Sequence, residues 1–243
     1  MNLVIDVGNS FMKLAVFQGS ELLEKKVVSK ENFEEEIQKI FQQHPKIDRK
    51  ILSSVSGSKF LTPDFLQKDE KFIELNLETP LPFLNKYATP KSLGNDRKAL
   101  VAAAAKYFKN SNVLVIDAGT CITYDFKNDK NEYLGGAISP GLNMRFKALH
   151  TFTANLPELI PTNEVELIGQ STAGSINSGV VHGLCCEIEG SILNYSERFK
   201  NLEIIFTGGD AQFLSKRLKN GIFANSNFLL EGLNYILEFN NTQ

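Results

Sequence analysis

The feature that most constrains the fold of this chain is a short pattern that occurs twice. Residues 3–8 read LVIDVG and residues 114–119 read LVIDAG, so five of six positions are identical at a constant spacing of 111 residues. Each copy is an apolar run that leads into an aspartate and then a glycine. Similarity at a fixed spacing indicates internal duplication. The sequence therefore predicts two similar α/β halves, each opening with a strand and a tight turn.

Each of the two turns has a structural and a chemical interpretation. A glycine after an apolar strand is typical of a simple hairpin turn. Such a turn also exposes backbone N–H groups with little side-chain bulk in the way, which suits a polyphosphate. Asp6 beside phosphates requires a divalent cation between the charges, which favours a Mg²⁺-nucleotide over bare phosphate. Because Asp117 repeats the pattern at the start of the second half, a nucleotide clasped between two carboxylates is the preferred interpretation.

Length and composition limit the remaining possibilities. A chain of 243 residues is long enough for two small domains, and the repeat places them at 1–110 and 111–243. The net charge of −2 gives no reason to expect nucleic acid or an anionic membrane as the main partner. No apolar run reaches the roughly 18 residues of a membrane-spanning helix. Three cysteines, an odd number, indicate buried free thiols in a reducing, cytoplasmic compartment.

A second candidate element follows an irregular loop. Residues 79–93 contain three prolines, and a loop of this length within a compact domain is often functional. The loop leads into Gly94-Asn95-Asp96-Arg97, after which an apolar helix is predicted over residues 98–108. Asp96 stands where a residue capping the helix would stand. It is also placed to accept a proton from a substrate hydroxyl, with Arg97 beside it to bind an anionic group. The pattern alone leaves both roles open.

The third candidate element is Thr207-Gly208-Gly209-Asp210, between a predicted strand and a predicted helix. Two glycines there leave a flat backbone surface for a ribose or a base. A strand-to-helix turn that needs positive φ would explain the same residues. The order of acidic turn, acidic turn and glycine turn along the chain favours a duplicated phosphate-binding ATPase core.

At this point the sequence resembles the type III pantothenate kinases over nearly its whole length. The Gly-x-Asp-Arg element is the most specific part of the resemblance, because the wider superfamily shares the phosphate turns but not this element. The other matching segments are residues 6–10, 117–120, 135–136, 140–141, 156–157, 169–172 and 207–210.

The resemblance implies a fold and an activity. These kinases belong to the actin-like ATPase and sugar-kinase superfamily, with two duplicated ribonuclease-H-like domains around a cleft. They are homodimers, and the predicted helix 175–199, with glycines at 179, 183 and 190, would let another backbone approach closely. They transfer the γ-phosphate of ATP to the terminal hydroxyl of pantothenate, which gives 4'-phosphopantothenate in the first step of coenzyme A synthesis.

The resemblance also implies roles for individual residues. Asp96 would be the general base, and Asp117 would bind a monovalent cation, K⁺ or NH₄⁺. Thr120 would contact ATP, together with a first phosphate loop that holds Mg²⁺-ATP. That loop comprises Asp6, Val7, Gly8, Asn9, Ser10, Phe11, Met12 and Lys13. The pantothenate site would be lined by Tyr87, Gly94, Asn95, Asp96, Arg97 and Thr172.

Two other functions remain open from the sequence. Relatives of these kinases can act as regulatory accessory factors, although intact Asp6, Asp96 and Asp117 argue against a loss of activity. A different small-molecule kinase or ATPase of the same superfamily would share the phosphate turns, and the Gly-x-Asp-Arg element argues against it. The departures from the family pattern are small: Ser10 stands where Thr is common, and residues 53–56 lack an expected proline.

Overall fold

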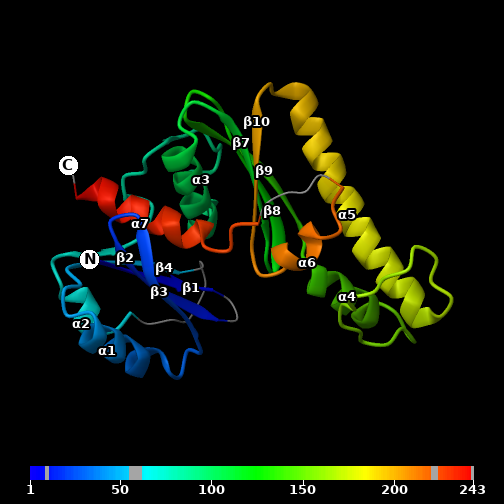
Figure 1. Cartoon of the computed structure of the whole chain (residues 1–243), viewed down its shortest axis with the longest axis horizontal. Coiled ribbons are helices and arrows are strands. Elements are labelled where there is room, and N and C mark those ends of the chain that lie inside the picture. The colour runs from blue at the N-terminus through cyan, green and yellow to red at the C-terminus, as the bar shows by residue number, and fades with distance from the viewer. Residues whose placement is uncertain (9–10, 55–61, 220–223, 242–243) are drawn as a thin grey trace. The chain divides into compact units, whose positions relative to one another are not determined.

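The computed structural model describes residues 1–8, 11–54, 62–219 and 224–241. The chain divides into two compact units, residues 1–109 with 227–243, and residues 110–226 (Figure 1). The second unit begins within one residue of the boundary predicted from the repeat. The division expected from the sequence placed everything after residue 110 in the second half, whereas the C-terminal segment packs in the first unit.

The first unit is built on a sheet in the order β3-β2-β1-β4-β5. Its strands are β1 (Asn2–Val7), β2 (Met12–Gln18), β3 (Glu21–Val28), β4 (Arg49–Ser54) and β5 (Phe72–Glu74). The central strand β1 is antiparallel to β2 and parallel to β4. A two-residue strand, β6 (Leu84–Asn85), and a short 3₁₀ helix, η1 (Pro90–Ser92), lie in the long loop predicted at residues 79–93.

The sheet of the second unit repeats this arrangement. Strands β7 (Asn112–Ala118), β8 (Cys121–Lys127), β9 (Glu132–Pro140) and β10 (Leu202–Thr207) follow in the order β10-β7-β8-β9. Here β7 is antiparallel to β8 and parallel to β10, as β1 is to β2 and β4. The duplicated α/β fold expected from the repeated sequence pattern is therefore confirmed.

Helices cover both faces of the first sheet. Because side chains alternate along a strand, Leu3 and Ile5 of β1 face one layer, formed by α1 (Phe33–Gln43) and α2 (Asp64–Gln67). The other face packs against α3 (Asn95–Tyr107) and α7 (Phe228–Asn240), where Asn2 Nδ2 donates to Asn234 Oδ1 at 2.8 Å.

The C-terminal helix α7 belongs to the first unit because its apolar side packs closely on α3. A Cβ atom on Gly232 would lie 1.9 Å from the carbonyl oxygen of Ala99, so the two helix backbones touch at this glycine. The side chains that α7 buries completely or nearly so are Phe228, Leu230, Leu233, Asn234, Ile236 and Leu237.

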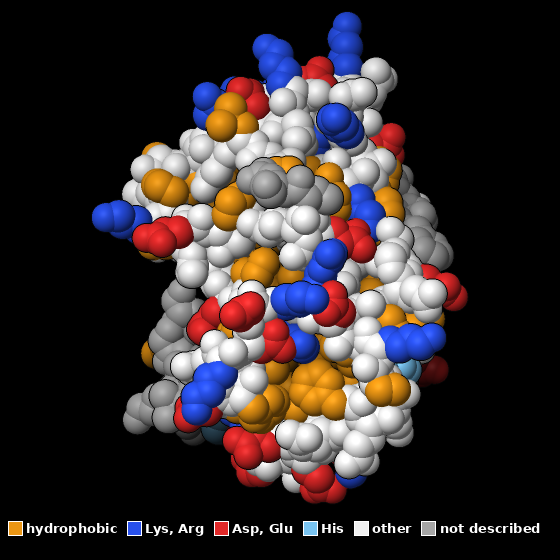
Figure 2. Space-filling view, turned by 90° about the vertical axis from the view of Figure 1, so that its left-hand side faces the viewer, with side chains coloured by type: hydrophobic (Ala, Val, Ile, Leu, Met, Phe, Trp, Pro, Cys, Tyr) orange, Lys and Arg blue, Asp and Glu red, His pale blue; other side chains and the backbone are white. Residues whose placement is uncertain are grey.

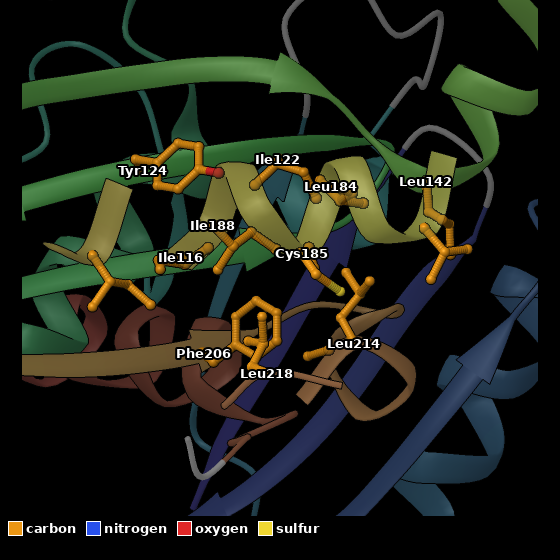
Figure 3. Close-up of a cluster of buried hydrophobic side chains, with 14 of the residues drawn as sticks. Ile116, Ile122, Tyr124, Leu142, Leu184, Cys185, Ile188, Phe206, Leu214 and Leu218 are labelled. Atoms are coloured by element: carbon orange, nitrogen blue, oxygen red, sulfur yellow. The ribbon is translucent and has the colours of Figure 1, made fainter. Parts of the chain in front are cut away.

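In the second unit, one face of the sheet is covered by α4 (Leu142–Thr151), α5 (Thr172–Arg198) and α6 (Ala211–Ser215). Figure 3 shows Cys185 and Ile188 of α5 directed toward Phe206 of β10 and toward Leu214 on α6. All three cysteines are free, as expected, but only Cys185 is buried; Cys121 is half-buried and Cys186 is exposed.

The surface and the helices agree with the bulk composition. On the face shown in Figure 2, basic and acidic side chains are interspersed, which matches a net charge close to zero. Within the described part of the chain, no helix is long and apolar enough to cross a membrane.

Candidate active site

The first acidic turn joins β1 to β2. Asp6 is the next-to-last residue of β1 and lies opposite Lys13 of β2. The Gly8 N–H donates to the carbonyl of Phe11 at 3.1 Å, and a Cβ atom on Gly8 would approach that oxygen to 2.9 Å. Only glycine fits at this position of the turn without a shift of the backbone. Asn9 and Ser10, predicted to contact ATP, lie outside the described residues.

Asp6 is almost fully buried, with 7% of its surface exposed. Burial raises its pKa from 3.8 to about 6; the positive charge of Lys13 opposes this, and the negative charge of Asp96 adds to it. The Lys13 ammonium lies 3.7 Å from Asp6 Oδ2. The first acidic turn and the Gly-x-Asp-Arg element therefore lie near each other within the first unit.

The other described residues of the predicted first phosphate loop differ in how far their side chains are exposed to solvent. Val7 and Met12 are fully buried, and their side chains belong to the core beneath the sheet. These two residues can reach a nucleotide only through their main chain. Phe11, in contrast, is 60% exposed at the tip of the turn.

Asp96 does not cap α3. The helix begins at Asn95, Gly94 takes the capping position, and no side chain caps it. Instead, Asp96 Oδ1 accepts the backbone N–H of Arg97 at 2.8 Å. A Cβ atom on residue 94 would lie 2.3 Å from that same Oδ1, so Gly94 leaves the space that the carboxylate occupies. This contact gives a steric reason for the glycine of the Gly-x-Asp-Arg element.

Arg97 and Tyr87, predicted to line the same substrate site, lie together. The Arg97 Cζ atom is 5.5 Å from the centroid of the Tyr87 ring, within the range of an attractive cation–π contact. Arg97 is 5% exposed, so its guanidinium is held in a largely buried position at the first turn of α3.

The side chain of Asn95 has a structural role at the start of α3. Its amide donates to the carbonyl of Ser54, the last residue of β4, at 3.2 Å and to that of Leu75, directly after β5, at 2.8 Å. Its Oδ1 accepts from Lys98 Nζ at 3.0 Å, and Lys98 also donates to the carbonyl of Asn76 at 3.2 Å. The side chain of Asn95 therefore positions the start of α3, and substrate could meet this residue only at its main chain.

Lys98 is a residue that sequence reasoning missed. It is 3% exposed, and burial lowers its pKa. The sequence signal that could have identified it is its place directly after Arg97 and directly before the apolar run 99–105 of α3.

The second acidic turn lies against the glycine turn that follows β10. Asp117 pairs with Thr207 across the parallel strands, and Gly208 has a φ of 101°. A Cβ atom on Gly208 would lie 2.4 Å from both Asp117 Oδ1 and the carbonyl oxygen of Ala118. Carboxylate and carbonyl oxygens are the ligands preferred by hard cations. The Ala118 carbonyl also accepts the N–H of Asp210 at 2.9 Å. The cation site implied for Asp117 stays a prediction.

Thr120 is exposed at the same turn and is approached by a third glycine. The Gly141 N–H donates to the Thr120 carbonyl at 3.2 Å. Arg145 supports this turn: its Nε donates to the carbonyl of Pro140 at 2.9 Å, and its Nη2 forms an ion pair with Glu187 of α5. Sequence reasoning missed this ion pair because its partners are 42 residues apart.

Thr172 lies in the second unit, where it lines the same groove as Arg145. It is the exposed first residue of α5, next to Ser171, whose Oγ accepts the N–H of Gly174 at 3.1 Å. Thr172 lines an open groove of about 910 Å³ between α4 and α5, together with Leu149 and Ile176. No residue of the turn that holds Asp117 lines that groove.

Comparison with known proteins decides the family. The sequence profile of the type III pantothenate kinases matches residues 2–194. The chain belongs to the type III pantothenate kinase family. It is 56% identical to the type III pantothenate kinase of Christiangramia forsetii over the full length of both chains. It is 49% identical to that of Flavobacterium johnsoniae over 98% of each chain.

Solved structures place this family member in its fold class. A protein from Campylobacter jejuni described as a Baf family transcriptional activator superposes with a TM-score of 0.64, at 23% identity, over 99% of this chain and all of the other. A glucokinase from an Antarctic psychrotroph superposes with a TM-score of 0.54 at 12% identity over 98% of each chain. These likenesses show the fold alone, that of the actin-like ATPases and sugar kinases.

Proposed function

We propose that this chain catalyses transfer of the γ-phosphoryl group of ATP to the terminal hydroxyl of pantothenate, which yields 4'-phosphopantothenate in the first step of coenzyme A biosynthesis. The observation that carries the proposal is the grouping of Asp6, Asp96 and Arg97 within one compact unit. Phosphoryl transfer depends on positioning and charge neutralisation, which this grouping can supply.

The proposed roles of the residues follow from which of their atoms already form hydrogen bonds. Asp6, in its glycine turn with Lys13, holds Mg²⁺-ATP through the metal and its water shell. Asp96 has one oxygen engaged by the Arg97 N–H, while its Oδ2 accepts no hydrogen bond from the described residues. That oxygen is the general base that takes the proton from the pantothenate hydroxyl. Arg97 and Tyr87, with the main chain of Gly94 and Asn95, bind the rest of pantothenate, and Thr172 supplies a further contact.

In the second unit, Thr120 contacts ATP, and Asp117 with the carbonyl of Ala118 holds K⁺ or NH₄⁺. When bound, this cation supplies positive charge beside the phosphates. The working form is a homodimer, consistent with the open apolar groove beside α5 and the exposed Phe152 at its edge. Its substrates place it in the cytoplasm.

The direct test is a coupled assay of ADP release with ATP, Mg²⁺ and K⁺, with and without pantothenate. Pantothenate-dependent ADP release is the expected result, and replacement of K⁺ by Na⁺ should remove most of it. ATP hydrolysis that is indifferent to pantothenate would point to another acceptor. No turnover with any cation would leave a regulatory role as the alternative.

The role of Asp96 is tested in the same assay. Asp96→Ala should reduce kcat by on the order of a hundredfold or more, because the proton acceptor is lost. Nucleotide affinity should stay nearly unchanged when it is measured separately by calorimetry. A kcat like that of the wild type would exclude Asp96 as the base.

A further inference from the structure

A polar cavity of about 710 Å³ lies in the second unit, among residues that the proposed reaction does not use. Its walls come from three places: the loop before α5, the middle of α5, and α6 with the residues that follow it. Leu214 and Leu218 point into the core (Figure 3), so the opposite side of this segment, with Phe213, Lys216 and Arg217, lines the cavity.

The wall formed by the loop is fixed in place. Ser178 Oγ donates to the carbonyl of Leu167 at 2.6 Å, and the Thr162 N–H donates to Asn177 Oδ1 at 3.3 Å. On the other side, Arg217 donates to the carbonyls of Asn163 and Phe213. These bonds join the loop, α5 and the α6 segment, so the cavity has defined walls.

The charge of the cavity is one-sided. Lys216 and Arg217 line it, and none of its lining residues carries a carboxylate, although acidic residues outnumber basic ones in the chain. Neither cation forms an ion pair within the described residues. The Arg217 guanidinium lies 3.6 Å from the centroid of the Phe213 ring and donates to two carbonyls. Its positive charge and the negative charge of Glu189 both act on the Cys185 thiol, so one carboxylate lies near the cavity although it does not line it. An arginine fixed in this way is prepared to bind an oxyanion.

His182 of α5 lines the same cavity as the two cations. Its Nε2 is shielded from solvent, so this atom does not face the open cavity. The imidazole ring is therefore a reporter of binding in the cavity and not one of the proposed binding groups.

We propose that this cavity binds a small phosphorylated organic molecule, with its phosphate on Lys216 and Arg217 and its organic part against Phe213 and Val165. The volume is typical of a pocket for a small organic ligand and far exceeds the needs of a bare phosphate ion. None of the lining residues belongs to the turns assigned above to ATP or pantothenate, but Gln212 and Phe213 come just after the glycine turn 207–210. We take the ligand to be an effector distinct from the substrates, and the nucleotide affinities measured below test this distinction.

The chain offers a clear spectroscopic test because it contains only three histidines. Phenyl phosphate is the probe, and the imidazole signals of His44, His150 and His182 are followed by NMR. We expect saturable shifts of the His182 signals alone. Phenol, which lacks the phosphate, should cause no shift. An absence of His182 shifts with phenyl phosphate would overturn the proposal.

Two variants separate this site from the nucleotide site. Lys216→Ala should weaken phenyl phosphate binding by about tenfold, the effect of losing one hydrogen bond to a charged group. Lys147→Ala on α4 is the control, because Lys147 is also exposed and unpaired among the described residues, and it should change nothing. Affinity for a non-hydrolysable ATP analogue with Mg²⁺ should be the same in both variants. A parallel tenfold loss of that affinity in Lys216→Ala would show that the cavity is part of the nucleotide site and would also overturn the proposal.

Discussion

Asp6 illustrates how a functional residue can lower the stability of the fold. Its pKa of about 6 exceeds the ordinary value of 3.8, so between these values the folded chain binds more protons than the unfolded chain. The free energy of unfolding therefore falls as the pH rises through this interval. Burial of an ionised carboxylate therefore costs free energy of folding. Such a cost is typical of a site whose carboxylate binds a metal-bound phosphate.

The corresponding prediction concerns Asp6→Asn. Above about pH 6 the variant should be more stable than the wild type, by about 2–3 kcal/mol at most, because a neutral amide avoids the cost of burying a charge. Urea unfolding at several pH values from 4 to 8 measures this difference, which should shrink toward pH 4. A difference independent of pH would show that burial of the charge is not its cause.

Gly94 provides a second prediction at this scale. In Gly94→Ala the new methyl group would lie only 2.3 Å from Asp96 Oδ1. Because this is too close for two non-bonded atoms, the carboxylate must turn aside. We expect a loss of kcat of roughly a hundredfold, since small displacements of a catalytic group are costly, while the melting temperature changes little.

Gly19→Ala is the control for Gly94→Ala, because nothing lies within 4 Å of the new atom and Gly19 lies in the turn between β2 and β3. Its φ of 59° makes alanine less stable there, but the variant should keep full activity. Equal activity in both variants would mean that Asp96 does not need its present orientation.

The sequence revealed these residues to different degrees. Asp6, Asp96 and Arg97 stand in local patterns whose chemistry can be interpreted from adjacent residues. The steric reason for Gly94 could not be predicted, because it depends on which way the Asp96 side chain turns. The partnership of Arg145 with Glu187 depends on the packing of α4 against α5, which no local pattern encodes.

At the scale of elements, the start of α3 is fixed by buried polar side chains. Asn95 and Lys98 together bond to three carbonyls, those of Ser54, Leu75 and Asn76, at the ends of β4 and β5. Because Asp96 lies between them, these bonds set the position of the proposed base relative to the sheet that carries Asp6.

This arrangement predicts coupling between the two side chains. Asn95→Ala and Lys98→Met should each lower the free energy of unfolding by about 1–3 kcal/mol, since each removes hydrogen bonds from the partly buried network at the start of α3. A double-mutant cycle should give an interaction energy of about 0.5–3 kcal/mol. Strict additivity would contradict the bond between Asn95 and Lys98. A kcat that falls in both variants with an unchanged KM for ATP would show that they position Asp96.

Sequence patterns were sufficient for the first hairpin of each sheet. The repeat of apolar strand, acidic turn and return strand implies the same local pairing twice, and the structure has β1 with β2 and β7 with β8 in the same sense. The first turn is one residue longer, since Asp6 faces Lys13 whereas Asp117 faces Thr123. The spacing of residues along the chain could not show this difference, because the two patterns align only up to the glycine.

For the whole molecule, the sequence was least informative about the last helix. Its apolar residues predict a buried helix at residues 229–239, close to the observed α7, but their spacing does not say which sheet it covers. The expectation that neighbours in sequence pack together placed it in the second half. The close contact of Gly232 with Ala99 instead joins it to α3 of the first unit.

Removal of residues 227–243 should therefore unfold the first unit and spare the second. The deletion exposes the apolar surface of α3 and of one face of the first sheet, and it takes away the amide partner of Asn2. Hydrogen exchange followed by mass spectrometry should show loss of protection across residues 1–109, whereas β7, β8 and β10 keep theirs. A shorter deletion of residues 241–243, beyond the end of α7, is the control and should leave both patterns unchanged. If protection were lost instead in residues 110–226, α7 would stabilise the second unit, and the boundary expected from the order of the sequence would be the better description.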